Sequence, residues 1–151
     1  GCLMIKAGDA DGMVAGQVLD TLYGIQTEEQ LKAMYRLKTG VMISGAAELG
    51  CVAADMPADM RAQAVEFADQ LGLAFQIRDD MLDVVGDQQV FGKPIGSDKE
   101  EGKITYVDVD GLEGCARAVE SCTQKAKDAV AHWPEHDFLF ALADQLVDRK
   151  K

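Results

Sequence analysis

Apolar side chains recur every three or four positions along most of the chain, which is the period of an amphipathic helix. The clearest repeat follows Thr27 and comprises Leu31, Met34, Tyr35, Lys38, Met42 and Ala46. Thr27 and Gln30 have the spacing of a capping box, in which each side chain satisfies a backbone N–H of the other residue. The pattern predicts a helix over residues 27–54.

The same period predicts further helices, and Gly or Pro residues end several of them. One begins after Met56-Pro57 and stops at Gly86, and another ends before Pro134. The expected ranges are 11–20, 57–85, 112–133 and 137–148. Turn residues do not recur at hairpin spacing, and aromatic residues make up only 6% of the chain. We therefore predict an all-α fold, an antiparallel helical bundle forming one domain over residues 1–151.

Residues 87–109 break this regularity. Gly92, Gly96 and Gly102 interrupt the segment, Pro94 lies between them, and charged side chains are dense. We expect a loop or a broken helix here. Loops carry binding and catalytic residues more often than core elements do.

The overall charge limits the class of ligand. The formal net charge is −11, whereas a general nucleic-acid binder needs a basic face. Simple docking on anionic lipid is disfavoured for the same reason, and no apolar run reaches the length of a membrane span. The four cysteines form no Cys-x-x-Cys pair, so we expect free thiols in a reducing cytoplasm rather than a zinc site.

The strongest chemical signal is the run Asp79-Asp80-Met81-Leu82-Asp83. On a helix, Asp79 and Asp83 share a face, and Gln76 lies one turn earlier on the same side. Mg²⁺ takes one or two carboxylates and fills its remaining positions with water and phosphate oxygens. The residues alone leave two interpretations open: a solvated acidic helix end or a magnesium site.

Three lysines favour the magnesium interpretation. Lys38 lies on an otherwise apolar helix stripe, where an unpaired charge is costly. Lys93 and Lys103 lie in the glycine-rich segment beyond the aspartates, and lysine binds phosphate as a point charge. Together these residues predict a diphosphate held between Mg²⁺ and ammonium groups.

Four segments in the same order resemble the trans-isoprenyl diphosphate synthase family. The run from Phe75 to Asp87 is similar to its second aspartate-rich motif, and the run from Gly92 to Tyr106 is similar to the segment that follows it. Lys38-Thr39-Gly40 and the run from Gly12 to Asp20 resemble two upstream motifs. The resemblance covers nearly the whole chain but only the C-terminal half of a family member. The bacterial farnesyl diphosphate synthase (geranyltranstransferase) subgroup is the most similar.

The resemblance implies roles for individual residues. The expected metal set for Mg²⁺, with Mn²⁺ as an alternative in vitro, is Asp79, Asp80 and Asp83. The residues expected to contact diphosphate are Lys38, Lys93, Lys103 and Gln17. Those expected at the reaction centre are Lys38, Thr39, Gln76 and Lys93. The implied reaction is Mg-assisted condensation of dimethylallyl or geranyl diphosphate with isopentenyl diphosphate, giving a short-chain product such as farnesyl diphosphate.

The chain also departs from the family pattern, because it carries no second Asp-Asp-x-x-Asp. We therefore expect a fragment that is inactive alone, exposes an apolar face and self-associates. The resemblance implies a homodimer for a full-length member, and product length is not predicted. Two alternatives remain: a non-catalytic helical subunit of the same fold, and a related terpene cyclase, which this aspartate motif disfavours.

Overall fold

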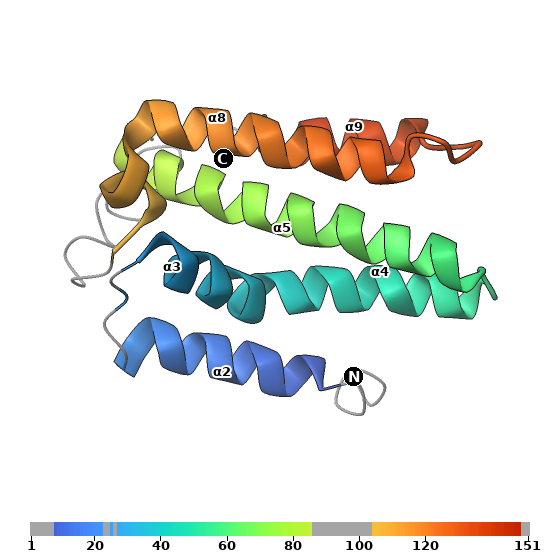
Figure 1. Cartoon of the computed structure of the whole chain (residues 1–151), viewed down its shortest axis with the longest axis horizontal. Coiled ribbons are helices and arrows are strands. Elements are labelled where there is room, and N and C mark those ends of the chain that lie inside the picture. Colours follow the sequence, from blue (N-terminus) through green and yellow to red (C-terminus); the bar gives the residue numbers. More distant parts are fainter. Residues whose placement is uncertain (1–7, 23–24, 26, 86–103, 149–151) are drawn as a thin grey trace.

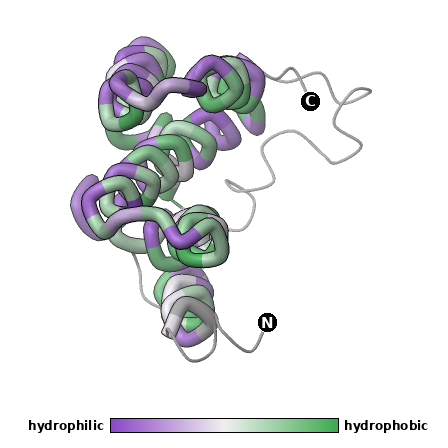
Figure 2. Tube along the Cα trace, turned by 90° about the vertical axis from the view of Figure 1, so that its right-hand side faces the viewer, coloured by the Kyte–Doolittle hydropathy of each residue, from purple (hydrophilic) through white to green (hydrophobic). Residues whose placement is uncertain are grey.

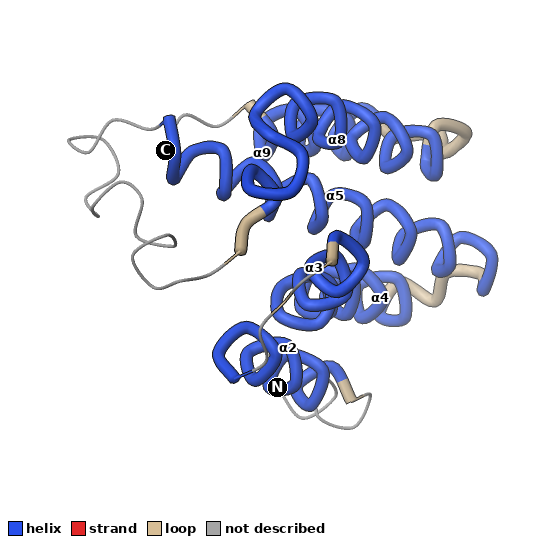
Figure 3. The backbone as a smooth tube through the Cα atoms, turned by 60° about the vertical axis from the view of Figure 1, so that its left-hand side comes forward, coloured by secondary structure: helices blue, strands red, loops and turns tan. Residues whose placement is uncertain are grey.

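The computed structural model describes residues 8–22, 25, 27–85 and 104–148. Within these ranges the regular elements are all helices, and neighbouring helices run in opposite directions (Figures 1 and 3). They are α2 (Asp9–Leu22), α3 (Glu28–Tyr35), η1 (Arg36–Gly40), α4 (Val41–Ala53), α5 (Ala58–Val85), α8 (Tyr106–Val130) and α9 (Asp137–Val147). The predicted all-α antiparallel bundle is confirmed.

The helix expected over residues 27–54 forms as three consecutive pieces, α3, η1 and α4. Its predicted capping box is present: the Gln30 backbone N–H donates to Thr27 Oγ1 at 3.2 Å, and the Thr27 N–H donates to Gln30 Oε1 at 3.2 Å. The central piece η1 has π-helical geometry, which the periodicity did not predict.

Helix α5 lies at the centre of the bundle and contributes to both core clusters. The first cluster joins α5 to α3 and α8 through residues that include Leu31, Ile77 and Cys115. The second joins it to α8 and α9 through Phe67 and Val130 among others. Viewed along the helices, α2 lies at one end of the stack and α8 and α9 at the other (Figure 2). Burial of these apolar faces supplies the main stabilisation of the fold.

The start of α8 corrects one prediction. The helix begins at Tyr106 rather than at Leu112, so residues 106–109 of the segment expected to be a loop or a broken helix are helical. A second capping box, between Thr105 and Asp108, fixes this start. Gly111 interrupts the helix with φ of 66°, a conformation that glycine adopts without steric cost. Residues 87–103 of the predicted segment lie outside the described residues.

Helix α2 carries an exposed apolar face. Met13, Val14 and Val18 are 37%, 59% and 39% exposed. With Gln17 and Thr21 they line a shallow groove of about 470 Å³. This agrees with the expected exposed apolar surface, whereas self-association through it stays a prediction.

None of the helices in the described ranges is long and apolar enough to cross a bilayer.

Three cysteines in the described residues, Cys51, Cys115 and Cys122, are free and buried. Cys115 and Cys122 pack in the first core cluster.

Candidate functional site

The π-helical turn η1 carries two of the predicted site residues, Lys38 and Thr39. Its geometry is seen at Val41, whose backbone N–H donates to the carbonyl oxygen of Arg36, five residues earlier. One extra residue in a helical turn redirects the side chains around it, and such turns occur frequently at functional sites. The Lys-Thr-Gly motif therefore coincides with a local departure from the regular helix.

Glycines let two other helices approach this turn closely. A Cβ added at Gly16 of α2 would lie 2.3 Å from the backbone nitrogen of Lys38 and 2.6 Å from its Cα. A Cβ added at Gly72 of α5 would lie 3.4 Å from the Cα of Gly40. The first contact cannot accommodate a side chain without movement of the backbone. The structure therefore holds the Lys38 turn between α2 and α5.

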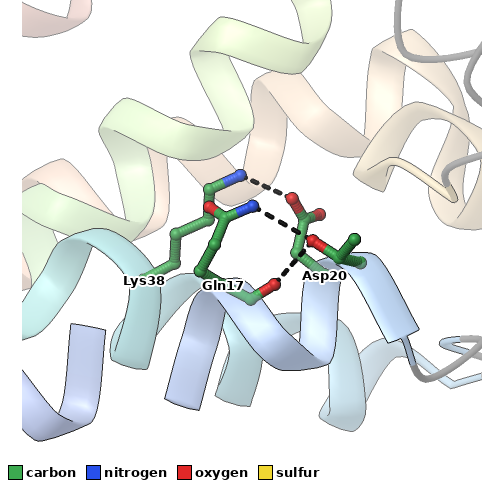
Figure 4. Close-up of polar contacts among 4 residues, drawn as sticks. Gln17, Asp20 and Lys38 are labelled. Carbon is green, nitrogen blue, oxygen red and sulfur yellow. Dashed lines mark hydrogen bonds and ion pairs between the residues drawn. The ribbon is translucent and has the colours of Figure 1, made fainter. Parts of the chain in front are cut away.

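The α2 contact brings Lys38 to Asp20. The Lys38 ammonium donates to Asp20 Oδ2 at 2.7 Å, and the Asp20 side chain is only 6% exposed, against 32% for Lys38 (Figure 4). A carboxylate buried to this degree is destabilised unless it is paired. The ion pair with Asp20 explains how a lysine is accommodated on an otherwise apolar helix stripe.

Gln17 of α2 lies beside the Lys38–Asp20 ion pair (Figure 4). Its side-chain amide donates to Thr21 Oγ1 at 3.1 Å, and the Thr21 hydroxyl donates to the Gln17 carbonyl oxygen at 2.8 Å. The structure thus brings together Gln17 and Lys38, which the sequence placed in the diphosphate-binding set, and adds Thr21 as a neighbour that the sequence did not indicate.

The aspartate motif lies near the C-terminal end of α5. Gly72 contacts η1, and residues three or four apart share a helix face. Gln76, Asp79 and Asp83 therefore continue the face of Gly72 toward the end of α5. Asp83 is 4% exposed, and Gln76 and Asp79 are half-buried. The shared face that the spacing predicted is present, and it begins at the η1 contact.

The Asp80 side chain lies off the face that carries Asp79 and Asp83, and it forms hydrogen bonds within the protein. The Tyr35 hydroxyl and the Tyr106 backbone N–H both donate to its Oδ2, the latter at 2.7 Å. The side chain is buried, with 7% exposure. These bonds connect α3, α5 and the first turn of α8, a structural role that sequence reasoning missed. The one available signal was Tyr35 on an apolar stripe, because a buried tyrosine hydroxyl needs a partner.

The donor set on α5 fits a magnesium ion that retains water. Asp79 and Asp83 supply two carboxylates on one face, and Mg²⁺ binds proteins through one or two carboxylates. In the described ranges no group of three or more His, Cys, Asp or Glu side chains is placed to hold a metal ion. Asp80 Oδ2 already accepts two hydrogen bonds, so its place in the metal set stays a prediction. Lys93 and Lys103 lie outside the described residues.

The sequence and fold of the chain match those of known proteins. Residues 3–136 match the model of a family described as polyprenyl synthetase. The chain belongs to the polyprenyl synthetase family.

Relatives with different product names show similar levels of identity. The farnesyl diphosphate synthase of Escherichia coli (strain K12) is 34% identical over 98% of this chain and 52% of its own length. The geranylgeranyl diphosphate synthase of Cyanophora paradoxa is 30% identical over 91% of this chain and 47% of its own. The chain spans about half the length of these curated relatives.

Solved structures support the same fold. A decaprenyl diphosphate synthase from Rhodobacter capsulatus superposes with a TM-score of 0.86 at 26% identity, covering 99% of this chain and 59% of that one. A heptaprenyl diphosphate synthase from Staphylococcus aureus gives a TM-score of 0.90 at 18% identity, covering 96% of this chain and 58% of that one. At that identity the second likeness shows the fold alone.

Proposed function

We propose that this chain supplies the allylic-diphosphate-binding half of a trans-prenyl diphosphate synthase. The reaction would condense dimethylallyl or geranyl diphosphate with isopentenyl diphosphate. The observation that carries the proposal is the π-helical turn η1, in which Lys38 packs against α2 and Gly40 packs on Gly72 of α5, the helix that also carries Gln76, Asp79 and Asp83. Cationic and carboxylate side chains on neighbouring helices are what a metal-bound diphosphate requires.

In this proposal each residue has one task. Asp79 and Asp83 would hold Mg²⁺, which neutralises charge on the departing diphosphate when bound. Lys38 has three N–H donors. Asp20 occupies one of them and fixes the direction of the ammonium group, so the others can reach phosphate oxygens.

Thr39 and Gln76 flank the η1–α5 contact and would line the site of the allylic carbocation. Preorganised polar groups stabilise developing charge without rearranging. Gln17 would line the same site from α2. Asp80 would support the site through its bonds to Tyr35 and Tyr106 rather than by touching substrate.

The product that we propose is farnesyl diphosphate. The farnesyl diphosphate synthases of Escherichia coli and Haemophilus influenzae both match 98% of the chain. A geranylfarnesyl diphosphate synthase of Aeropyrum pernix also matches, at 38% identity over 68% of the chain. Product analysis by chromatography of the dephosphorylated alcohols distinguishes these lengths. We further propose that the full protein is a cytoplasmic homodimer.

Calorimetric titration of pyrophosphate into this chain, with and without Mg²⁺, tests the proposal. We expect metal-dependent binding that weakens by about tenfold or more in Asp79→Ala and in Lys38→Ala. Glu66→Gln, which removes an exposed carboxylate earlier on α5, is the matched control and should bind as the unchanged chain does. Mn²⁺ should replace Mg²⁺. Equal metal-dependent binding by all variants would remove Asp79 and Lys38 from the proposed site.

A further inference from the structure

A second pocket lies away from the aspartate face, between α3, α5 and α8. Its volume is about 230 Å³. Gln70 and Ile77 of α5 form part of its wall, whereas Gln76, Asp79 and Asp83 face a different side of the same helix. The pocket is therefore separate from the proposed diphosphate site.

The charges that line this pocket are all positive. Lys32, Arg36 and Lys125 contribute to its wall, and none of its lining residues is a carboxylate. The chain as a whole has a net charge of −11. Three cations around one small cavity are therefore a local reversal of the charge of the protein.

All three cations influence one side chain, the thiol of Cys122. Cys122 also lines the pocket. Burial raises the pKa of the Cys122 thiol, and the positive charges of Lys125, Lys32 and Arg36 act in the opposite direction. The cations enter the pocket wall from two sides, Lys32 from α3 and Arg36 from η1 on one side and Lys125 from α8 on the other.

Two of these cations form no ion pair with the described residues, although the Asp69 carboxylate of α5 interacts with Arg36 at longer range. Lys32 pairs with Glu28 at 2.5 Å and lies 5.6 Å from the centre of the Tyr106 ring. Within the described ranges, neither Arg36 nor Lys125 forms an ion pair with a carboxylate. Like charges one helical turn apart, as at Lys32 and Arg36, repel each other. A bound anion relieves this repulsion.

We propose that this pocket binds a small phosphate-type anion without a metal ion. An Arg guanidinium offers a planar fork of donors to phosphate oxygens and a Lys ammonium offers a point charge. The Ser121 hydroxyl, which also lines the pocket, supplies a neutral donor. Orthophosphate, pyrophosphate and polyphosphate share this chemistry.

Titration of these three anions in EDTA tests the proposal, because removal of divalent metal prevents metal-dependent binding at Asp79 and Asp83. We expect saturable binding of at least one anion, weakening as salt is raised. Amide NMR shifts should map to Arg36, Ser121 and Lys125. The anion that binds most tightly identifies which of the three the pocket takes.

The double variant Arg36→Gln/Lys125→Gln should weaken this binding by about tenfold or more. Arg61→Gln/Lys127→Gln removes the same charge from positions of α5 and α8 that do not line the pocket and should leave the binding unchanged. Asp79→Ala should also leave metal-free binding unchanged, which separates this result from the test of the proposed function. Absence of binding at millimolar anion, or equal loss in both double variants, would overturn the proposal.

Discussion

The carboxylate of Asp80 accepts a hydrogen bond from the backbone N–H of Tyr106 at 2.7 Å, although 26 positions separate the two residues. The Tyr35 hydroxyl donates to the same oxygen. One buried carboxylate thus ties α3, α5 and the first turn of α8 together. This end of α5 also carries Asp79 and Asp83, so the bond positions the start of α8 relative to the proposed metal ligands.

Removing this carboxylate should destabilise the fold. Hydrogen bonds to charged groups contribute about 1.5–3 kcal/mol each, and an unsatisfied buried partner adds a desolvation cost. We expect Asp80→Ala to lower the free energy of unfolding by about 3 kcal/mol, measured by urea denaturation. Tyr35→Phe should cost less, because it removes only one donor. Glu66→Ala, at an exposed position of the same helix, is the control and should change stability little; an equal loss in Glu66→Ala would contradict the structural role of Asp80.

Lys38 and Asp20 should be energetically coupled. Lys38→Met leaves the buried Asp20 carboxylate without its ammonium partner, which we expect to cost about 1–2 kcal/mol because Lys38 is partly solvated. Adding Asp20→Asn should recover part of that loss, since the buried charge that lost its ammonium partner is then absent. Thermal unfolding of the two single variants and the double variant gives the coupling energy. Lys32→Met, at an exposed pair, should change stability by about 0.5 kcal/mol or less. Additive losses would show that the pair is not coupled.

Gly16 should tolerate no side chain. Gly16→Ala places a methyl group 2.3 Å from the Lys38 backbone nitrogen, so α2 must move away from η1. We expect a loss of about 1–3 kcal/mol in the free energy of unfolding, as for other overpacked contacts. Gly50→Ala is the matched control. An added Cβ there meets nothing within 4 Å, and alanine favours the helix by up to about 1 kcal/mol. A neutral Gly16→Ala would contradict the close contact.

The Cys115 thiol should be unreactive in the native protein. Burial, followed by the negative charges of Asp80 and Asp110, raises its pKa to about 11. At pH 8 roughly one thiol in a thousand is then ionised, and the thiolate is the reactive form. Iodoacetamide labelling followed by mass spectrometry should show Cys115 modified quickly only in guanidinium chloride.

The same shift predicts a pH dependence. The unfolded thiol ionises first, near pH 9, so stability should fall as pH rises from about 9 toward about 11. Cys115→Ala should reduce this fall when denaturation is measured across that range. Labelling of native Cys115 at the rate of a free thiol would contradict its burial.

The apolar face of α2 should mediate self-association of this chain. Val14→Lys places a charge in the groove lined by Met13 and Val18, and we expect it to shift size-exclusion elution toward a 16.3 kDa monomer. Val52→Lys makes the same change at an exposed valine of α4 and should not shift elution. A compact monomer without any substitution would contradict the expectation of a self-associating fragment.

Helix positions and their capping were predictable because their causes are local. The three-and-four spacing after Thr27 and the Thr27–Gln30 pair act within a few residues of each other, and both are confirmed. The start of α8 was placed too late because glycines in the flanking segment suggested a loop, whereas Thr105, Asp108 and the distant Asp80 fix a helical turn at Tyr106.

The candidate site was predictable only in part. Spacing alone placed Gln76, Asp79 and Asp83 on one helix face, and the Lys-Thr-Gly motif singled out Lys38. Spacing did not predict that Lys38 lies on a π turn or that Asp20 is its partner.

The sequence by itself determined the helices, most of their ends and the family, because short-range periodicity, caps and ordered motifs are written along the chain. Only the tertiary structure decided which distant residues come together: Asp20 with Lys38, Asp80 with the Tyr106 backbone, and Lys125 with Lys32 and Arg36 around one pocket. These contacts depend on how closely the helices pack. A contact such as Gly16 against η1 joins residues from separate helices, and no local pattern encodes the relative placement of those helices.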